Sequence, residues 1–202
     1  FAGTGINRER LWLHYNWLPA EDAPTPGKPH LPPFVWLTEA LETCHDLYEV
    51  EALLRAVDRD GGMLLFAVDG RRDAGAVFEC TCASHTQREL TGPWIAGTNH
   101  SVIHSVVGVP NAAQPLSPSQ QRLARLETLA QGLLTHDGSL AMPWDLIRIL
   151  VDDAVEKRDK DDGTVYANVA CPGQRLLWYT FGGYPAASAG AWHALAWPWE
   201  NH

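Results

Sequence analysis

Two carboxamide side chains stand where apolar segments of the sequence end. Asn16 interrupts the bulky segment LHYNWLP, and Asn99 follows the apolar run 94–96 in GTNHSV, with His100 directly after it. A fixed Asn NH2 group can donate to the tetrahedral oxyanion of acyl transfer without adding a titratable charge, and losing one such donor typically slows the reaction about 100- to 1,000-fold. Both residues are candidate oxyanion donors, although an Asn that caps a turn remains an open interpretation of each.

Other kinds of catalytic site have less support. The sequence contains no G-x-S-x-G motif, no H-E-x-x-H motif and no glycine-rich phosphate loop, which disfavours an α/β-hydrolase, a zinc protease and a nucleotide-binding protein. His100 and His104 are four positions apart, but the residues between them are typical of a strand or loop, so a metal hydrolase is a minor alternative. The four cysteines include one C-x-C pair and no second pair. We therefore predict no metal site and no cofactor.

Length and charge limit the classes of partner. A chain of 202 residues suits one large domain, residues 1–202. Fifteen basic against 24 acidic residues give a formal net charge of −9, and no basic cluster is longer than two residues, so we expect no nucleic-acid partner. No stretch approaches the roughly 20 apolar residues that span a bilayer, so we expect no membrane partner. The compartment stays undecided, with the cytoplasm favoured.

The candidate residues would be carried by segregated strands and helices. A proline-rich loop is expected at 20–33, and Asp46 and Ser117 are expected to cap the helices that follow them. The predicted strands are residues 10–18, 61–70, 74–81, 93–99, 163–171 and 174–183. The predicted helices are residues 34–45, 48–59, 117–132 and 143–157. This order favours a layered α+β domain over a doubly wound parallel sheet.

The segments and their order resemble one family. GTGINRERLWLHYNWLP, the pair LLFAVDG and AGAVFECT, GTNHSV and SPSQQRLARLETL are similar to the acyl-coenzyme A:isopenicillin N acyltransferase group and the related choloylglycine hydrolases and penicillin V acylases. Gly5-Ile6-Asn7 and Leu11 fit the family's G-x-N-x-x-G-L segment, whereas Arg10 replaces its usual glycine. The resemblance implies an N-terminal-nucleophile (Ntn) hydrolase, with an α+β fold that is an αββα sandwich of mainly antiparallel sheets.

The resemblance also implies roles for particular residues. Asn16 would be an oxyanion donor, and Asn99, in the family's T-N motif, would position the reacting α-amine and the substrate carbonyl. Arg122 would belong to a charge network behind the nucleophile, with Arg125 as the less favoured candidate.

Substrate contacts follow from the same resemblance. Trp17 and the loop 20–33 would shape an acyl pocket, and His100, which follows the style of the acyltransferase branch, would bind substrate. The expected substrate is a small-molecule acyl amide or acyl thioester, and the implied activity is hydrolysis of an amide C–N bond or acyl transfer through an acyl-cysteine intermediate.

The family's nucleophile has no counterpart in this sequence. It is a cysteine made N-terminal by self-cleavage, whose own α-amine serves as base. Here the first residue is Phe1, and none of the four cysteines occupies an equivalent place. We therefore expect a fold that is incomplete at the N-terminus, with the cysteine on a missing segment or on a second chain. A non-catalytic binding or structural relative is the alternative, and a homo-oligomer is left open.

Overall fold

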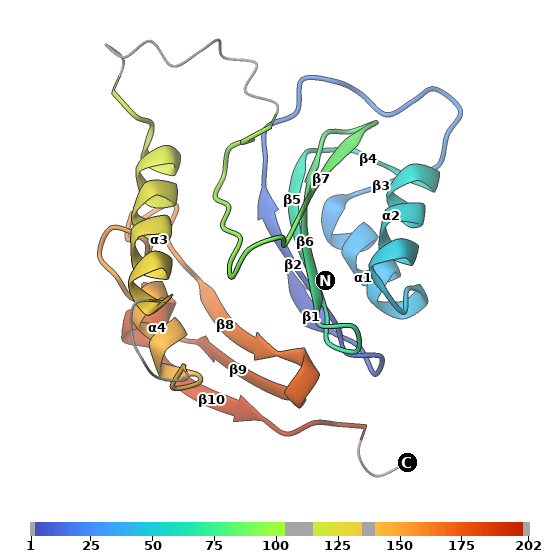
Figure 1. Cartoon of the computed structure of the whole chain (residues 1–202). Helices are drawn as coiled ribbons and strands as arrows, with labels where there is room; N and C mark the ends of the chain where they lie inside the picture. Colours follow the sequence, from blue (N-terminus) through green and yellow to red (C-terminus); the bar gives the residue numbers. More distant parts are fainter. Residues whose placement is uncertain (1–2, 104–114, 135–139, 200–202) are drawn as a thin grey trace. The chain divides into compact units, whose positions relative to one another are not determined.

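The computed structural model describes residues 3–103, 115–134 and 140–199 (Figure 1). Among these residues, no helix is both long enough and apolar enough to cross a membrane.

The chain forms two compact units. The N-terminal unit is Phe1–Pro115 and the C-terminal unit is Leu116–His202. Each unit contains a sheet and helices of its own. This division does not decide whether the whole chain is one domain, so the single domain over residues 1–202 stays a prediction.

The N-terminal unit is built on a five-stranded antiparallel sheet. Its strands, in spatial order, are β1 (Thr4–Ile6), β2 (Leu11–Trp17), β5 (Met63–Asp69), β6 (Ala74–Cys80) and β7 (His85–Glu89). On one side β2 pairs with β1, and on the other it pairs with β5, where His14 lies opposite Phe66 and Asn16 opposite Leu64. The predicted strand that carries Asn16 and the predicted hairpin of β5 and β6 are confirmed.

Two helices cover one face of this sheet, as Figure 1 shows. They are α1 (Pro33–Thr43) and α2 (Leu47–Ala56), and the short parallel strands β3 (His30–Leu31) and β4 (Asp58–Arg59) flank them in the chain. The Asp46 carboxylate accepts a hydrogen bond of 3.0 Å from the Glu49 amide, which confirms the predicted cap. The core between helices and sheet includes the fully buried side chains of Leu11, Leu13, Trp36, Leu37, Val50, Leu65 and Phe78.

Strand alternation divides β2 between the two faces of the sheet. Leu11 and Leu13 are buried against the helices. Because successive side chains of a strand point to opposite faces, Trp12, His14 and Asn16 project from the other face. We call this other side, opposite α1 and α2, the helix-free face of the sheet.

The turn that leads into β2 is fixed by one side chain. The Asn7 carboxamide donates to the carbonyls of Leu41 (3.1 Å) and Cys44 (2.8 Å) and accepts from the Leu11 amide (3.1 Å). Arg10, which replaces the glycine expected from the resemblance, adopts a φ of 65°. This left-handed conformation is the one that glycine adopts without a steric penalty.

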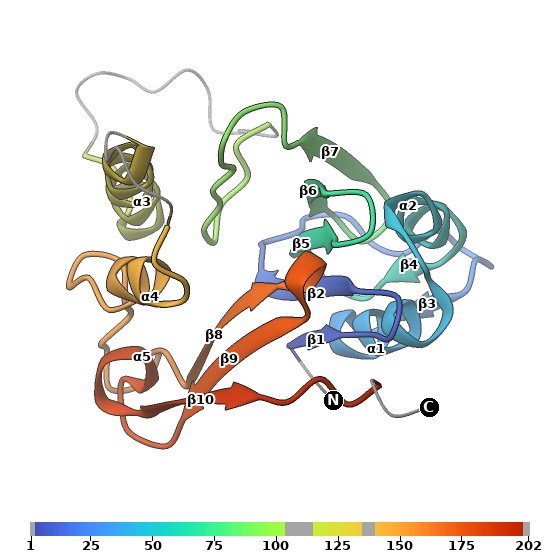
Figure 2. The same ribbon diagram turned by 60° about the horizontal axis from the view of Figure 1, so that its bottom comes forward.

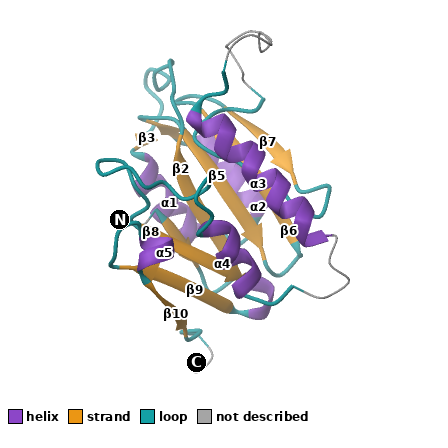
Figure 3. Cartoon of the chain, turned by 90° about the vertical axis from the view of Figure 1, so that its left-hand side faces the viewer, coloured by secondary structure: helices purple, strands orange, loops and turns teal. Residues whose placement is uncertain are grey.

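The C-terminal unit contains a three-stranded antiparallel sheet, shown in Figures 2 and 3. The strand order is β10 (Ala191–Leu195), β9 (Leu176–Phe181) and β8 (Tyr166–Cys171), and the 3-10 turn Pro172–Gln174 joins β8 to β9 as predicted. The helices of this unit are α3 (Pro118–Leu134), α4 (Trp144–Leu150) and α5 (Ala186–Ala189).

Helix α5 is fixed to one face of this three-stranded sheet. The Thr180 hydroxyl donates to the Ala186 carbonyl (3.1 Å), and the Trp192 indole donates to the Ala187 carbonyl (3.0 Å). Thr180 and Trp192 are paired across β9 and β10 and so share a face. Tyr179 projects from the opposite face. The units thus combine antiparallel sheets with separate helices, and the predicted α+β class is confirmed.

One predicted strand is wrong. Residues 93–99 form a loop, and the third strand of the group is β7 instead. Pro93 cannot donate to a strand ladder, and the Ala96 carbonyl accepts from the Arg88 side chain (3.0 Å) rather than from a neighbouring strand. The edge of β6 is already occupied by β7.

Three predicted helix ends are also wrong. The helix predicted at 48–59 ends at Ala56, because Asp58–Arg59 form strand β4. Helix α3 continues past Gly132 to Leu134, because a glycine inside a helix costs only about 1 kcal/mol. Helix α4 ends at Leu150, well before residue 157. Beyond it the Asp152 carboxylate accepts from the Ala154 amide (3.0 Å), a local bond that competes with helical pairing. The short elements β1, β3, β4, β10 and α5 were not predicted, since so few residues carry no clear periodicity.

Candidate active site

Asn16 lies beside the half-buried imidazole of His14 on the helix-free face. The His14 ring is stacked on Trp12, with ring centres 5.7 Å apart, and its centre lies 6.1 Å from that of Phe66. Burial lowers the pKa of His14 to about 4, while a hydrogen bond with the Asn16 side chain acts in the opposite direction. His14 is therefore neutral at pH 7, and it holds the Asn16 carboxamide without adding a charge.

Asn99 is tied to the same strand end. Its Nδ2 donates a hydrogen bond of 3.0 Å to the backbone carbonyl of Trp17, the residue that follows Asn16. Asn99 belongs to residues 94–103, which we call the Asn99 loop. The two carboxamides are thus brought to one end of β2, although they are 83 positions apart in the sequence.

The Asn99 loop lies over the helix-free face. Gly97 is buried, and a Cβ at this position would come within 2.8 Å of a Leu64 methyl carbon and 3.0 Å of the Phe66 ring. Leu64 is the strand partner of Asn16, and Phe66 is the partner of His14. The close approach that brings Asn99 to this face therefore requires glycine at position 97.

A buried ion pair lies under the same loop. Glu79 of β6 is fully buried, and its Oε1 lies 2.8 Å from Nε of Arg88 on β7. Glu79 pairs with Leu64 across the strands and so belongs to the helix-free face. Sequence reasoning missed both residues. The feature of the sequence that could have indicated this pair is the carboxylate of Glu79 inside the otherwise apolar run 74–80.

The two predicted substrate-binding residues are placed differently. His100 is next to Asn99, and its Nδ1 lies 3.1 Å from the hydroxyl of the buried Thr98, which fixes the ring. Trp17 is the last residue of β2 and is 58% exposed. Alternation directs its side chain to the face opposite Asn16, so the structure does not bring Trp17 and Asn16 together. Both roles stay predictions.

Arg122 belongs to the other unit of the chain. It is half-buried on α3, where burial lowers its pKa and the charge of Asp162 raises it in part. Arg125, the less favoured candidate, forms an ion pair with Asp152, with Nη2 2.6 Å from Oδ2. Of the two arginines, Arg122 is thus the more buried. Its role behind a nucleophile stays a prediction.

The cysteines of the N-terminal unit are poor nucleophiles. Cys44, Cys80 and Cys82 are buried and free. Burial raises the pKa of Cys44 to about 11 and that of Cys80 to about 12, and it also raises the pKa of Cys82. Since the thiolate is the reactive form, these groups are inert thiols at neutral pH. Cys171 is half-buried on β8.

No group of three metal-ligating side chains occurs within residues 3–103, 115–134 and 140–199. His104, which the metal-hydrolase alternative pairs with His100, lies outside the described residues.

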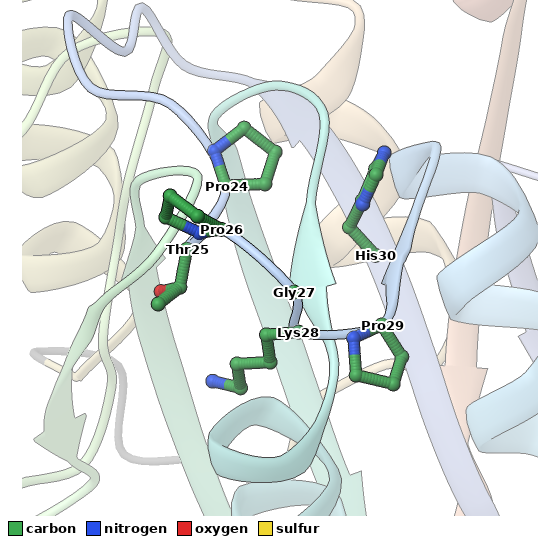
Figure 4. Close-up of a pocket in the computed structure, with 7 residues that line it drawn as sticks. All are labelled: Pro24, Thr25, Pro26, Gly27, Lys28, Pro29 and His30. Carbon is green, nitrogen blue, oxygen red and sulfur yellow. The ribbon is translucent and has the colours of Figure 1, made fainter.

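A pocket of about 720 Å³ lies in the proline-rich loop (Figure 4). Residues 24–30 line it, and they fall within the 20–33 segment that was expected to shape an acyl pocket. Its shape is fixed by Asp58, which is fully buried, accepts from the Thr25 amide (2.8 Å) and pairs with Lys28 Nζ at 2.5 Å. Binding of the acyl group of a substrate in this pocket stays a prediction.

The fold is similar to those of conjugated bile acid hydrolase and penicillin V acylase. Among solved structures, the chain is similar to two variants of conjugated bile acid hydrolase from Clostridium perfringens, each with a TM-score of 0.66, at 14% and 16% identity. These matches cover 98% of this chain and 74% and 73% of those chains. It is also similar to penicillin V acylase from Agrobacterium tumefaciens, with a TM-score of 0.65 and 13% identity over 91% of this chain and 64% of that chain.

These similarities confirm the predicted likeness to the choloylglycine hydrolases and penicillin V acylases at the level of fold. No family model matches the sequence, and a search of curated protein sequences finds no match. At identities of 13–16%, the structural likeness shows the fold alone.

Proposed function

We propose that this chain forms the oxyanion-binding part of an Ntn-type amide hydrolase or acyltransferase, whose cysteine nucleophile lies outside these 202 residues. The observation that carries the proposal is the hydrogen bond from Asn99 Nδ2 to the Trp17 carbonyl. It holds one carboxamide at the strand end where Asn16 is held by His14. Two neutral carboxamides held at one strand end are suited to a negative charge that exists only during the reaction.

The chemistry follows from these groups. Attack of a thiolate on an amide carbonyl breaks the C=O π bond and leaves a negative charge on the oxygen, which Asn16 and Asn99 would stabilise. Collapse of this intermediate breaks the C–N bond, and the amine leaves with a proton. The resulting acyl thioester then reacts with water in hydrolysis, or with another acceptor in transfer. His100, fixed beside Asn99, would contact the substrate.

The raised pKa values of Cys44, Cys80 and Cys82 support an outside nucleophile, because none of these thiols is activated. They equally favour a second candidate, a non-catalytic binding or structural relative of the Ntn fold. The two candidates differ in whether a reactive cysteine can be supplied.

The test begins with the coding sequence upstream of Phe1. The proposal expects a cysteine codon directly after a processing site, and expects the protein that includes this cysteine to release amine from acyl amides. Penicillin V and a glycine-conjugated bile acid are suitable first members of the panel, each followed by amine release. An upstream frame without such a cysteine, or a processed and folded protein that cleaves no member of a broad acyl-amide panel, would leave the non-catalytic candidate.

A further inference from the structure

We propose that Glu79 and Arg88 are positioning residues that hold the Asn99 loop on the sheet and so fix the Asn99 carboxamide. The inference rests on the proposed function, in which Asn99 is an oxyanion donor. Glu79 and Arg88 themselves would contact neither the substrate nor the nucleophile.

The carboxylate of Glu79 holds the part of the loop that follows Asn99. Its Oε2 accepts from the backbone amides of Val102 (3.0 Å) and Ile103 (3.1 Å). It also accepts from the hydroxyl of Ser101. Glu79 is fully buried and its charge is balanced by Arg88, and hydrogen bonds to an ionised group in such surroundings are about twice as strong as neutral ones.

The guanidinium of Arg88 holds the part of the loop that precedes Asn99. Its Nη1 donates to the Ala96 carbonyl at 3.0 Å, while its Nε faces Glu79. The two residues of one ion pair therefore form hydrogen bonds with the loop on both sides of Asn99, three residues before it and two to four residues after it.

The Asn99 loop is not part of the strand ladder of the sheet. The described residues 94–103 form no strand with the sheet. The side chains of Glu79 and Arg88 therefore bind backbone groups that would otherwise pair with a neighbouring strand. A misplacement of about 1 Å in a catalytic group can cost on the order of 100-fold in rate. A loop that carries an oxyanion donor therefore needs such fixed points.

Hydrogen exchange of the 202-residue protein tests the inference without activity. Glu79→Gln removes the negative charge but keeps the size of the side chain. We expect the backbone amides of Val102 and Ile103 to exchange at least about ten-fold faster in this variant, because their acceptor is weakened. Asp58→Asn is the matched control, since it also neutralises a buried carboxylate that pairs with a cation and holds a loop. It should change these amides less than two-fold.

A second variant keeps the test decisive if Glu79→Gln does not fold. Arg88→Lys retains a cation near Glu79 but loses the planar group that also reaches Ala96. Faster exchange centred on residues 96–99 supports the inference. Unchanged exchange in the folded variants, or equal acceleration in Asp58→Asn, overturns it.

Kinetics separate this inference from the proposed function. In a protein that includes the nucleophile, Glu79→Gln should lower kcat about 10- to 100-fold, with KM changed less than about three-fold, because the donor is misplaced and the substrate contacts remain. A loss carried by KM alone would contradict a positioning role. Absence of any hydrolysis in the parent protein, together with a loop that still responds in exchange, would remove the proposed function and keep the assignment of the pair to the loop.

Discussion

The Asn99 carboxamide donates a hydrogen bond of 3.0 Å to the backbone carbonyl of Trp17, the neighbour of Asn16 in the strand. A carboxamide NH2 group has two hydrogens, so the bond to Trp17 sets the plane in which the second hydrogen lies. Asn16 is oriented by a different partner, His14. Two carboxamides from distant parts of the chain are thus held by separate partners at one strand end.

The first prediction concerns the donor itself. Asn99→Asp keeps the shape of the side chain but replaces NH2 by a carboxylate oxygen, which repels both the Trp17 carbonyl and a developing oxyanion. In a protein that includes the nucleophile, we expect kcat to fall about 100- to 1,000-fold, measured as amine release at saturating acyl amide.

The matched control for this variant is Gln121→Glu. It makes the same amide-to-carboxylate change on the exposed surface of α3, and we expect it to leave kcat within about two-fold. Equal kcat for the Asn99→Asp variant and the parent protein would show that Asn99 does not stabilise the transition state.

The second prediction concerns pH. His14 has its pKa lowered from 6.5 to about 4 by burial, so below pH 6.5 the unfolded chain binds a proton that the folded chain resists. The free energy of unfolding should therefore fall as the pH is lowered from about 6.5 to about 4, by up to about 3 kcal/mol from this group. Urea unfolding at several pH values measures the slope.

A His14→Gln variant removes the titrating group from the same position. Its unfolding free energy should lose this part of the slope between pH 6.5 and 4 while the rest of the acid dependence remains. A slope identical in the variant and the parent protein would show that His14 is protonated as readily in the folded state as in the unfolded state.

Local patterns were sufficient for much of the N-terminal unit. The aromatic and apolar run 10–18 predicted β2, and helical spacing with Asp46 before it predicted α2 and its cap. These signals depend on neighbours within one strand or one turn. The strand placement of Asn16 therefore followed from the sequence.

The surroundings of Asn99 depend on distant residues and could not be found in this way. The segment 93–99 was predicted to be a strand, but the Ala96 carbonyl accepts from Arg88, and the Val102 and Ile103 amides that follow the segment donate to Glu79. Nothing in the local sequence indicates these partners. Arg122 is also remote from both carboxamides in the sequence, and it belongs to the other unit.

The third prediction concerns the turn before β2. Arg10 has a φ of 65°, which is unfavourable for a side chain with a Cβ and free of penalty for glycine. Arg10→Gly should raise the free energy of unfolding by up to about 1 kcal/mol, because relief of strain outweighs the added freedom of the unfolded chain. Arg8→Gly, two residues earlier and without a positive φ, should lower stability instead. A loss of stability in both variants would mean that Arg10 is not strained.

The fourth prediction concerns the close approach of the Asn99 loop to the sheet. In Gly97→Ala the new methyl group would meet a Leu64 methyl carbon at 2.8 Å and the Phe66 ring at 3.0 Å. The loop must move away from the sheet to relieve this overlap, so we expect a loss of about 1 to 3 kcal/mol in unfolding free energy. In a protein that includes the nucleophile, we also expect a fall in kcat with little change in KM.

Gly92→Ala lies nearby in the chain, where a Cβ meets nothing within 4 Å. This control should leave both unfolding and kcat near their parent values, and similar losses in the two variants would show that contact with the sheet is not what fixes the loop.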